Sequence, residues 1–60
     1  MAKFLLEIET GNEGMSSEFD IARALNHVSK EIESVGMLYH ERYTIKDING
    51  NTVGFYKVVP

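Results

Sequence analysis

An amphipathic pattern between Ser17 and Gly36 constrains the fold of this chain more than any other feature of its sequence. The apolar residues in it recur at alternating spacings of four and three, which places them on one face of an α-helix. They are Ile21, Leu25, Val28, Ile32 and Val35, and Ala22 and Ser29 widen the same stripe. Because the repeat is short, the pattern favours a helix that packs on a sheet over a coiled coil, and we expect the whole stripe to lie in the core.

Both ends of this segment carry helix-terminal signals. Ser17 followed by Asp20 resembles a capping box, and Glu18 and Asp20 place negative charge where the helix dipole favours it. Gly36 can adopt the positive φ that commonly ends a helix. We predict a helix over residues 17–36. Its polar outer side consists of Asp20, Arg23, Asn26, His27, Lys30, Glu31 and Ser34.

Three shorter segments have strand patterns. Residues 3–10 alternate, so that one face is apolar and Leu5 is the apolar exception on the other face. Residues 37–46 and 52–59 are rich in aromatic and β-branched residues, and the turn signal Asp-Ile-Asn-Gly-Asn at residues 47–51 lies between them. We predict a strand over residues 3–10 and a hairpin of the other two segments.

Two registers of this hairpin are possible. A two-residue loop would pair Ile45 with Gly54 and Tyr43 with Tyr56. A type I turn with Gly50 in the left-handed conformation collects the apolar residues on one face and gives a glutamate a lysine partner. Its pairs are Ile45 with Val53, Tyr43 with Phe55, Glu41 with Lys57 and Tyr39 with Val59. We predict the second register.

This register leaves a half-apolar outer face, because a single helix covers only one side of a sheet. Arg42 is expected beside Tyr56 there, an arrangement that interfaces favour. The candidate interaction residues are Leu5, Leu38, His40, Arg42, Tyr56 and Val58. We expect a second copy or another protein to cover this face.

The order of strand, helix, strand and strand predicts one α+β domain over residues 1–60. If the helix crosses back over the sheet, the first strand lies beside the third, which gives an antiparallel sheet with the order 1-3-2. The rival arrangement places the first strand parallel to the second through a right-handed crossover. We favour the first arrangement, although the sequence leaves the second open.

The composition limits the classes of function. Without cysteines the chain has no disulfide framework and no cysteine-ligated zinc site. A net charge of −3 argues against recognition of nucleic acid through its phosphates, and no apolar run reaches the length of a membrane span. We therefore expect a cytoplasmic protein. On folding, a chain this short buries only about 60% of the surface that it exposes when unfolded. This favours self-association, as a dimer above all.

The sequence contains no motif that indicates catalysis. The glycines of residues 11–17 match neither the P-loop nor the dinucleotide fingerprint. His27 and His40 are expected to have surface roles. We expect no enzyme, no metal site and no cofactor. The acidic residues that form an expected acidic surface are Glu7, Glu9, Glu13, Glu18 and Asp20.

Three segments together carry a family resemblance. They are KFLLEIETGN at the start, AxAL within the helix, and IKDINGNTVGFY near the end. Their combination resembles small bacteriophage and prophage proteins in which two GN-containing segments flank one helix, and it covers nearly the whole chain. The resemblance implies a phage origin but no particular activity. The chain departs from the shorter members in its longer, aromatic segment MLYHERYTI.

These observations favour a non-enzymatic protein-interaction module of a phage or mobile element. In a more specific version, the acidic surface inhibits a host defence or nucleic-acid enzyme by facing its basic channel. The alternative is a small nucleic-acid-binding protein that uses the tyrosines of the hairpin together with Arg42, Lys46 and Lys57.

Overall fold

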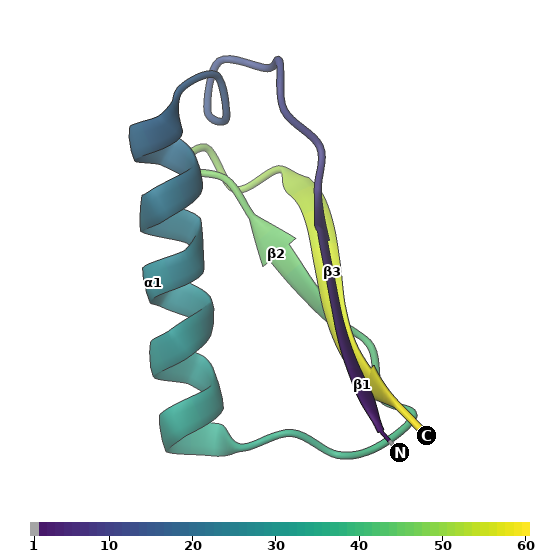
Figure 1. Cartoon of the computed structure of the whole chain (residues 1–60). Helices are drawn as coiled ribbons and strands as arrows, with labels where there is room; N and C mark the ends of the chain where they lie inside the picture. Colours follow the sequence, from purple (N-terminus) through teal and green to yellow (C-terminus); the bar gives the residue numbers. More distant parts are fainter. Residues whose placement is uncertain (1) are drawn as a thin grey trace.

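One helix packs on one face of a three-stranded antiparallel sheet in the computed structural model, which describes residues 2–60 (Figure 1). The elements follow the order β1 (Lys3–Ile8), α1 (Glu18–Val35), β2 (Tyr43–Lys46) and β3 (Thr52–Val59). The strand order is β1-β3-β2, with both pairs antiparallel. This arrangement confirms the predicted α+β fold and its strand order, and the parallel rival is wrong.

The predicted signals define both ends of α1. The Asp20 N–H donates to the Ser17 hydroxyl oxygen at 3.3 Å, and the Ser17 N–H donates back to the Asp20 carboxylate at 3.2 Å. This capping box satisfies N–H groups that the first turn leaves without helical partners. At the other end Gly36 has φ of +83°, and its N–H donates to the Ile32 carbonyl at 3.0 Å.

The core lies mainly between α1 and the β2–β3 hairpin. Its buried residues are Met15, Ala24, Val28, Ile45, Val53 and Tyr56. Of the predicted helix stripe, Val28 is buried, while Leu25 is 44% exposed and Val35 at the end of α1 is more exposed still. The buried face of α1 includes Ala24, which lies outside the predicted stripe, because α1 packs chiefly over β2 rather than over the middle of the sheet. The prediction that the whole stripe is core is therefore wrong.

The second strand is much shorter than predicted. Only Tyr43–Lys46 is strand, whereas residues 37–42 form a loop in which His40 has φ of +72°. The chain leaves α1 in one layer and has to return to the sheet, and packed layers lie about 10 Å apart. Residues 37–42 cross this distance. The Tyr43 hydroxyl oxygen holds the connection by accepting the Leu38 N–H at 3.0 Å.

The hairpin register differs from the predicted one because of a β-bulge. The turn itself is as predicted, since the Gly50 N–H donates to the Asp47 carbonyl at 3.1 Å and Gly50 has φ of +85°. A register shift follows in β3, between the partners of Ile45 and Lys46. Beyond it the pairs are Tyr43 with Tyr56, Thr44 with Phe55 and Ile45 with Gly54, and the predicted pairs are wrong.

Gly54 explains why the chain tolerates this register. It lies in the central strand opposite Ile8 on one side and Ile45 on the other. A Cβ atom at this position would overlap the backbone carbonyl of Glu7. Only glycine permits β1 to approach so closely, whereas Val53 on the bulge turns its side chain into the core.

Candidate functional site

The register of β3 places the candidate interaction residues differently from the prediction. Tyr56 is only 3% exposed and stacks on Tyr43, with 5.3 Å between ring centroids. Residues directly opposite each other share a face, and Tyr56 pairs with Leu6 on its other side. Tyr56 therefore faces α1. Burial raises the pKa of its hydroxyl above the usual value, and the charge of Glu31 and the neighbouring Tyr43 raise it further.

The outer sheet face carries a different set of residues. Val58 shares the helix-facing side with Phe4, which is its partner in β1, while Leu38 and His40 lie in the loop before β2. Of the six predicted interaction residues, Leu5 and Arg42 remain on the outer face. The prediction that Tyr56 and Val58 lie there is wrong, because the bulge turns every later residue of β3 to the opposite face.

Phe55 takes the place that was predicted for Tyr56. The Arg42 guanidinium lies 3.9 Å from the centroid of its ring, and the Lys57 ammonium lies 5.7 Å from it. Two cations thus cover this one aromatic ring. The middle of the outer face is closed by the chain itself.

The predicted acidic residues do not gather into one surface. Glu7 and Glu9 line a shallow pocket together with Arg42, whereas Asp20 lines a separate groove between α1 and β2. Glu13 lies in the loop before α1, and Glu18 in its first turn. Within residues 2–60 no three acidic or histidine side chains are placed to hold a metal ion.

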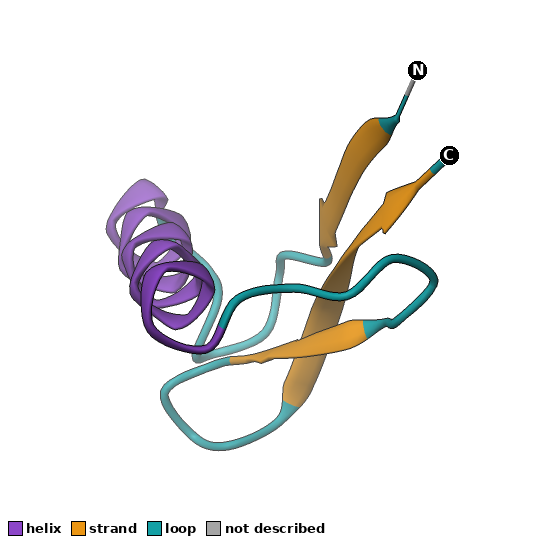
Figure 2. Cartoon of the chain, turned by 90° about the horizontal axis from the view of Figure 1, so that it is seen from below, coloured by secondary structure: helices purple, strands orange, loops and turns teal. Residues whose placement is uncertain are grey.

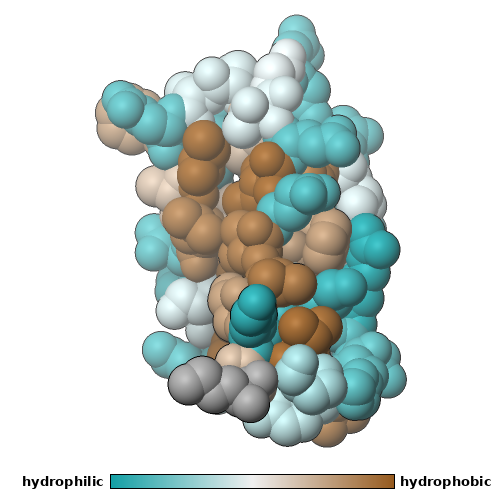
Figure 3. Space-filling view, turned by 45° about the vertical axis from the view of Figure 1, so that its right-hand side comes forward, coloured by the Kyte–Doolittle hydropathy of each residue, from teal (hydrophilic) through white to brown (hydrophobic). Residues whose placement is uncertain are grey.

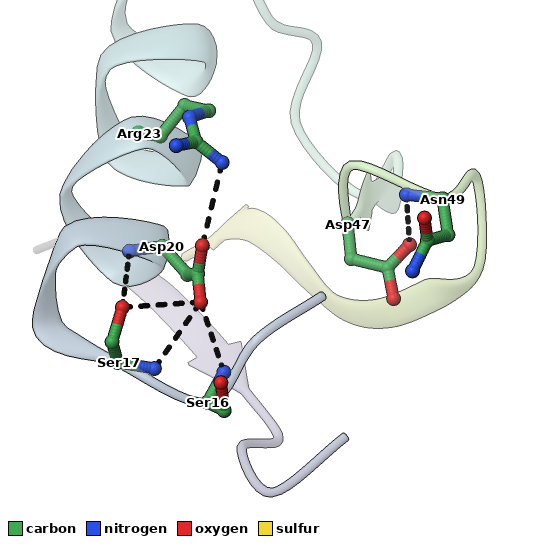
Figure 4. Close-up of polar contacts among 6 residues, drawn as sticks. All are labelled: Ser16, Ser17, Asp20, Arg23, Asp47 and Asn49. Atoms are coloured by element: carbon green, nitrogen blue, oxygen red, sulfur yellow. Dashed lines mark hydrogen bonds and ion pairs between the residues drawn. The ribbon is translucent and has the colours of Figure 1, made fainter. Parts of the chain in front are cut away.

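The carboxylate of Asp20 is engaged in the helix cap (Figure 4). It accepts hydrogen bonds from the Ser16 and Ser17 N–H groups, from the Ser17 hydroxyl and from Arg23, at 3.1 to 3.3 Å. The Ser16 N–H contributes most to holding the pKa of this carboxyl below its usual value. Its oxygens are therefore used locally, which leaves Asp20 a structural role.

On the packed side of the molecule, a groove remains between α1 and β2. It has a volume of about 440 Å³, and its walls include Met15, Ala24 and Tyr43. The turn after β2 closes its upper end, where the Asp47 carboxylate accepts the N–H groups of Asn49 at 2.9 Å and Asn51 at 2.8 Å. Two ion pairs, Asp20 with Arg23 and His27 with Glu31, line it from α1, and Thr44 and Lys46 line it from β2.

The opposite side, between α1 and β1, is open. Figure 2 shows β1 at the far side of the sheet from β2, with α1 standing away from it. Phe4 is 50% exposed here even though its ring lies 6.2 Å from that of Tyr56. Figure 3 looks toward β1 and shows apolar residues gathered in a strip down the middle of this side. We define the apolar strip as Phe4, Leu6, Ile8, Ile21 and Leu25.

The backbone of β1 adds a second feature to the open side. The Glu9 N–H donates to the Val53 carbonyl at 2.7 Å, which fixes the orientation of the strand. Backbone groups of successive residues alternate in direction, so those of Phe4, Leu6 and Ile8 point away from β3. We define the β1 edge as the backbone N–H and C=O groups of Phe4, Leu6 and Ile8 that point away from β3. Within residues 2–60 no other strand pairs with it.

The sequence did not indicate this site directly. The signal for the open side in the sequence was the wide apolar stripe of the helix. A helix that packs over one short strand cannot bury all of that stripe. Leu25 is the residue that sequence reasoning assigned to the core and that the structure places at the open side.

Comparisons of the chain with protein-family models, with curated proteins and with solved structures find no match. In the part of the chain that the structure describes, α1 is not apolar enough to cross a membrane.

Proposed function

We propose that the chain is a non-enzymatic protein-interaction module of a phage or mobile element, and that it binds through the β1 edge and the apolar strip. The observation that carries the proposal is their position side by side. A regular strand of six residues presents unpaired backbone groups next to half-exposed apolar side chains. Proteins that bind by strand addition use this combination, in which backbone hydrogen bonds give affinity and side chains give specificity.

The alternative of nucleic-acid binding has less support. It relied on tyrosines on an open face, but Tyr43 and Tyr56 face α1. Arg42 and Lys57 lie over Phe55, so the one aromatic ring at the centre of the outer face is already covered by cations. Inhibition of a host defence or nucleic-acid enzyme stays a prediction, and the scattered acidic residues give it no added weight.

A capture experiment with a matched pair of variants tests the proposal. Leu5→Glu adds a carboxylate on the outer face beside the β1 edge, opposite Lys57, which compensates the charge within the monomer. Thr44→Glu adds the same charge on the same face but in β2. We expect the partner that the immobilised wild type captures, whether another protein or a second copy of this chain, to be retained by Thr44→Glu and lost by Leu5→Glu. Equal capture by both variants would contradict the proposed site.

A titration of the purified protein with labelled single- and double-stranded DNA and RNA at low salt tests the alternative. We expect no binding. Clear binding that weakens as salt is added would instead favour the nucleic-acid alternative.

A further inference from the structure

We infer that the partner at the β1 edge is a second copy of this chain, paired antiparallel with the first through β1 about a two-fold axis at Leu5. This inference rests on the proposed function and names its partner. The axis is perpendicular to the sheet, so the two sheets become one continuous sheet with both helices on the same face. The two apolar strips then meet over the paired β1 strands.

The backbone groups of β1 are compatible with this pairing. An antiparallel pair exchanges both hydrogen bonds between residues whose groups point toward each other. With Leu5 on the axis, Phe4 lies opposite Leu6 of the second copy, and Leu6 lies opposite its Phe4. The backbone N–H and C=O groups of both residues point away from β3, because the hydrogen bond from Glu9 to Val53 fixes the direction of these groups along β1. Two pairs of hydrogen bonds can therefore form.

The charges of β1 are self-complementary in this register. Lys3 and Glu7 are its only charged residues, and both lie on the outer face beside Leu5. The two-fold axis places Lys3 of each copy opposite Glu7 of the other, and Leu5 opposite Leu5. Neither Lys3 nor Glu7 takes part in the ion pairs found among residues 2–60. Opposite charges directly across a strand pair stabilise it.

Neighbouring registers are less favourable. A shift of the pairing by one residue would place helix-side residues opposite outer-face residues and separate the apolar strips. A shift that puts Leu6 on the axis keeps the faces but sets Glu7 opposite Leu5 of the second copy. The register centred on Leu5 is the one that pairs each charge of β1 with an opposite charge and each apolar residue with an apolar one.

The exposed surface area of the chain is larger than that of a typical monomer of the same mass, which supports a second copy as partner. The chain exposes 4556 Å², whereas a folded monomer of 6.8 kDa exposes about 3,950 Å² by the usual scaling with mass. The excess of about 600 Å² per chain amounts to about 1,200 Å² for two chains, which is the lower end of specific interfaces. The other edge strand offers less, because β2 has four residues and lies between the His40 turn and the bulge.

Charge reversal tests the inference. Lys3→Glu and Glu7→Lys each turn both attractive pairs into repulsive ones, so either variant should dimerise roughly tenfold or more weakly than the wild type. An equimolar mixture of the two variants restores opposite charges at both positions, and so does the double variant. We expect sedimentation velocity to show dimers for the wild type, the mixture and the double variant, and monomers for each single variant at the same concentration.

Circular dichroism and thermal unfolding of each variant check that the monomer keeps its fold. A wild type that stays monomeric up to about 1 mM overturns the inference. Single variants that dimerise as the wild type does also overturn it. If the wild type is monomeric but Leu5→Glu still abolishes capture of another protein, the self-pairing fails while the proposed function stands. If capture is unaffected as well, both fail.

Discussion

The two sides of α1 differ in how completely they are packed. Toward β2, the helix buries Ala24 and Val28 against Ile45, and Met15 from the preceding loop is almost fully enclosed. Toward β1, Leu25 and Phe4 remain about half exposed beside a strand edge that no strand of residues 2–60 covers. The packed side provides the stability of the domain, and the open side carries the surface that we propose for a partner. Variants on each side should separate these two roles.

The largest effect is expected on the packed side, from Tyr56→Lys. The change places an ammonium group where the phenol ring stacks on Tyr43, at a cost of about 3 kcal/mol or more. A domain of this size has roughly 3 to 9 kcal/mol of stability, so the variant should lose a third of it or more. Urea unfolding followed by circular dichroism measures the change. Tyr39→Lys, at an exposed loop position, is the control. Equal stability of the two variants would contradict the burial of Tyr56.

An intermediate effect separates two neighbouring positions of α1. Val28 is 5% exposed and Leu25 is 44% exposed, although both belong to the predicted stripe. Val28→Ala should lower the free energy of unfolding by about 2 kcal/mol, because it leaves a cavity on the packed side. Leu25→Ala removes more atoms but should cost only about 1 kcal/mol in dilute solution, since its side chain is half solvated. Chemical denaturation at low protein concentration measures both, and the reverse order would contradict the described packing of α1.

The smallest effect is expected from the helix cap, as a change in pH dependence. The pKa of Asp20 is lower in the folded chain than its ordinary value of 3.8, chiefly because the Ser16 N–H donates to its carboxylate. The folded state therefore holds this proton less tightly than the unfolded state. The contribution of the cap to the stability of the fold is fully present above pH 3.8. It is lost as the pH falls through the lower pKa that Asp20 has in the folded chain. Thermal unfolding of the wild type and Asp20→Asn between pH 2 and 7 tests this sign. The difference between the two proteins should shrink toward acid, and a difference that grows there would contradict it.

The fold was predictable where the signals are local. The serine and aspartate of the capping box and Gly36 define the helix, and the turn residues 47–50 define the hairpin. The strand order was favoured by the helix crossing back over the sheet, but the sequence left the parallel rival open. Met15 was missed because a single apolar residue in a glycine-rich loop gives no periodic signal, yet it is only 1% exposed.

The site was less predictable, because it depends on contacts between elements. One extra residue in β3 moved Tyr56 from the expected outer face to the core, and no local pattern marks that bulge. Gly54 is the one residue type in the sequence that reflects this register. A glycine is needed there because β1 approaches closely, not because the chain turns. The exposure of Leu25 depends on where α1 sits over the sheet. An amphipathic period fixes which face is apolar but not how much of that face the sheet covers.

Amide hydrogen exchange at the two edges of the sheet tests the central claim most directly. The N–H groups of Phe4 and Leu6 point to the β1 edge, whereas that of Thr44 points away from β3 at the other edge, because its neighbours pair with Gly54 and Tyr56. We expect Phe4 and Leu6 to exchange slowly in concentrated solution and faster on dilution, while Thr44 exchanges fast throughout. Fast exchange of Phe4 and Leu6 at every concentration would contradict pairing through β1.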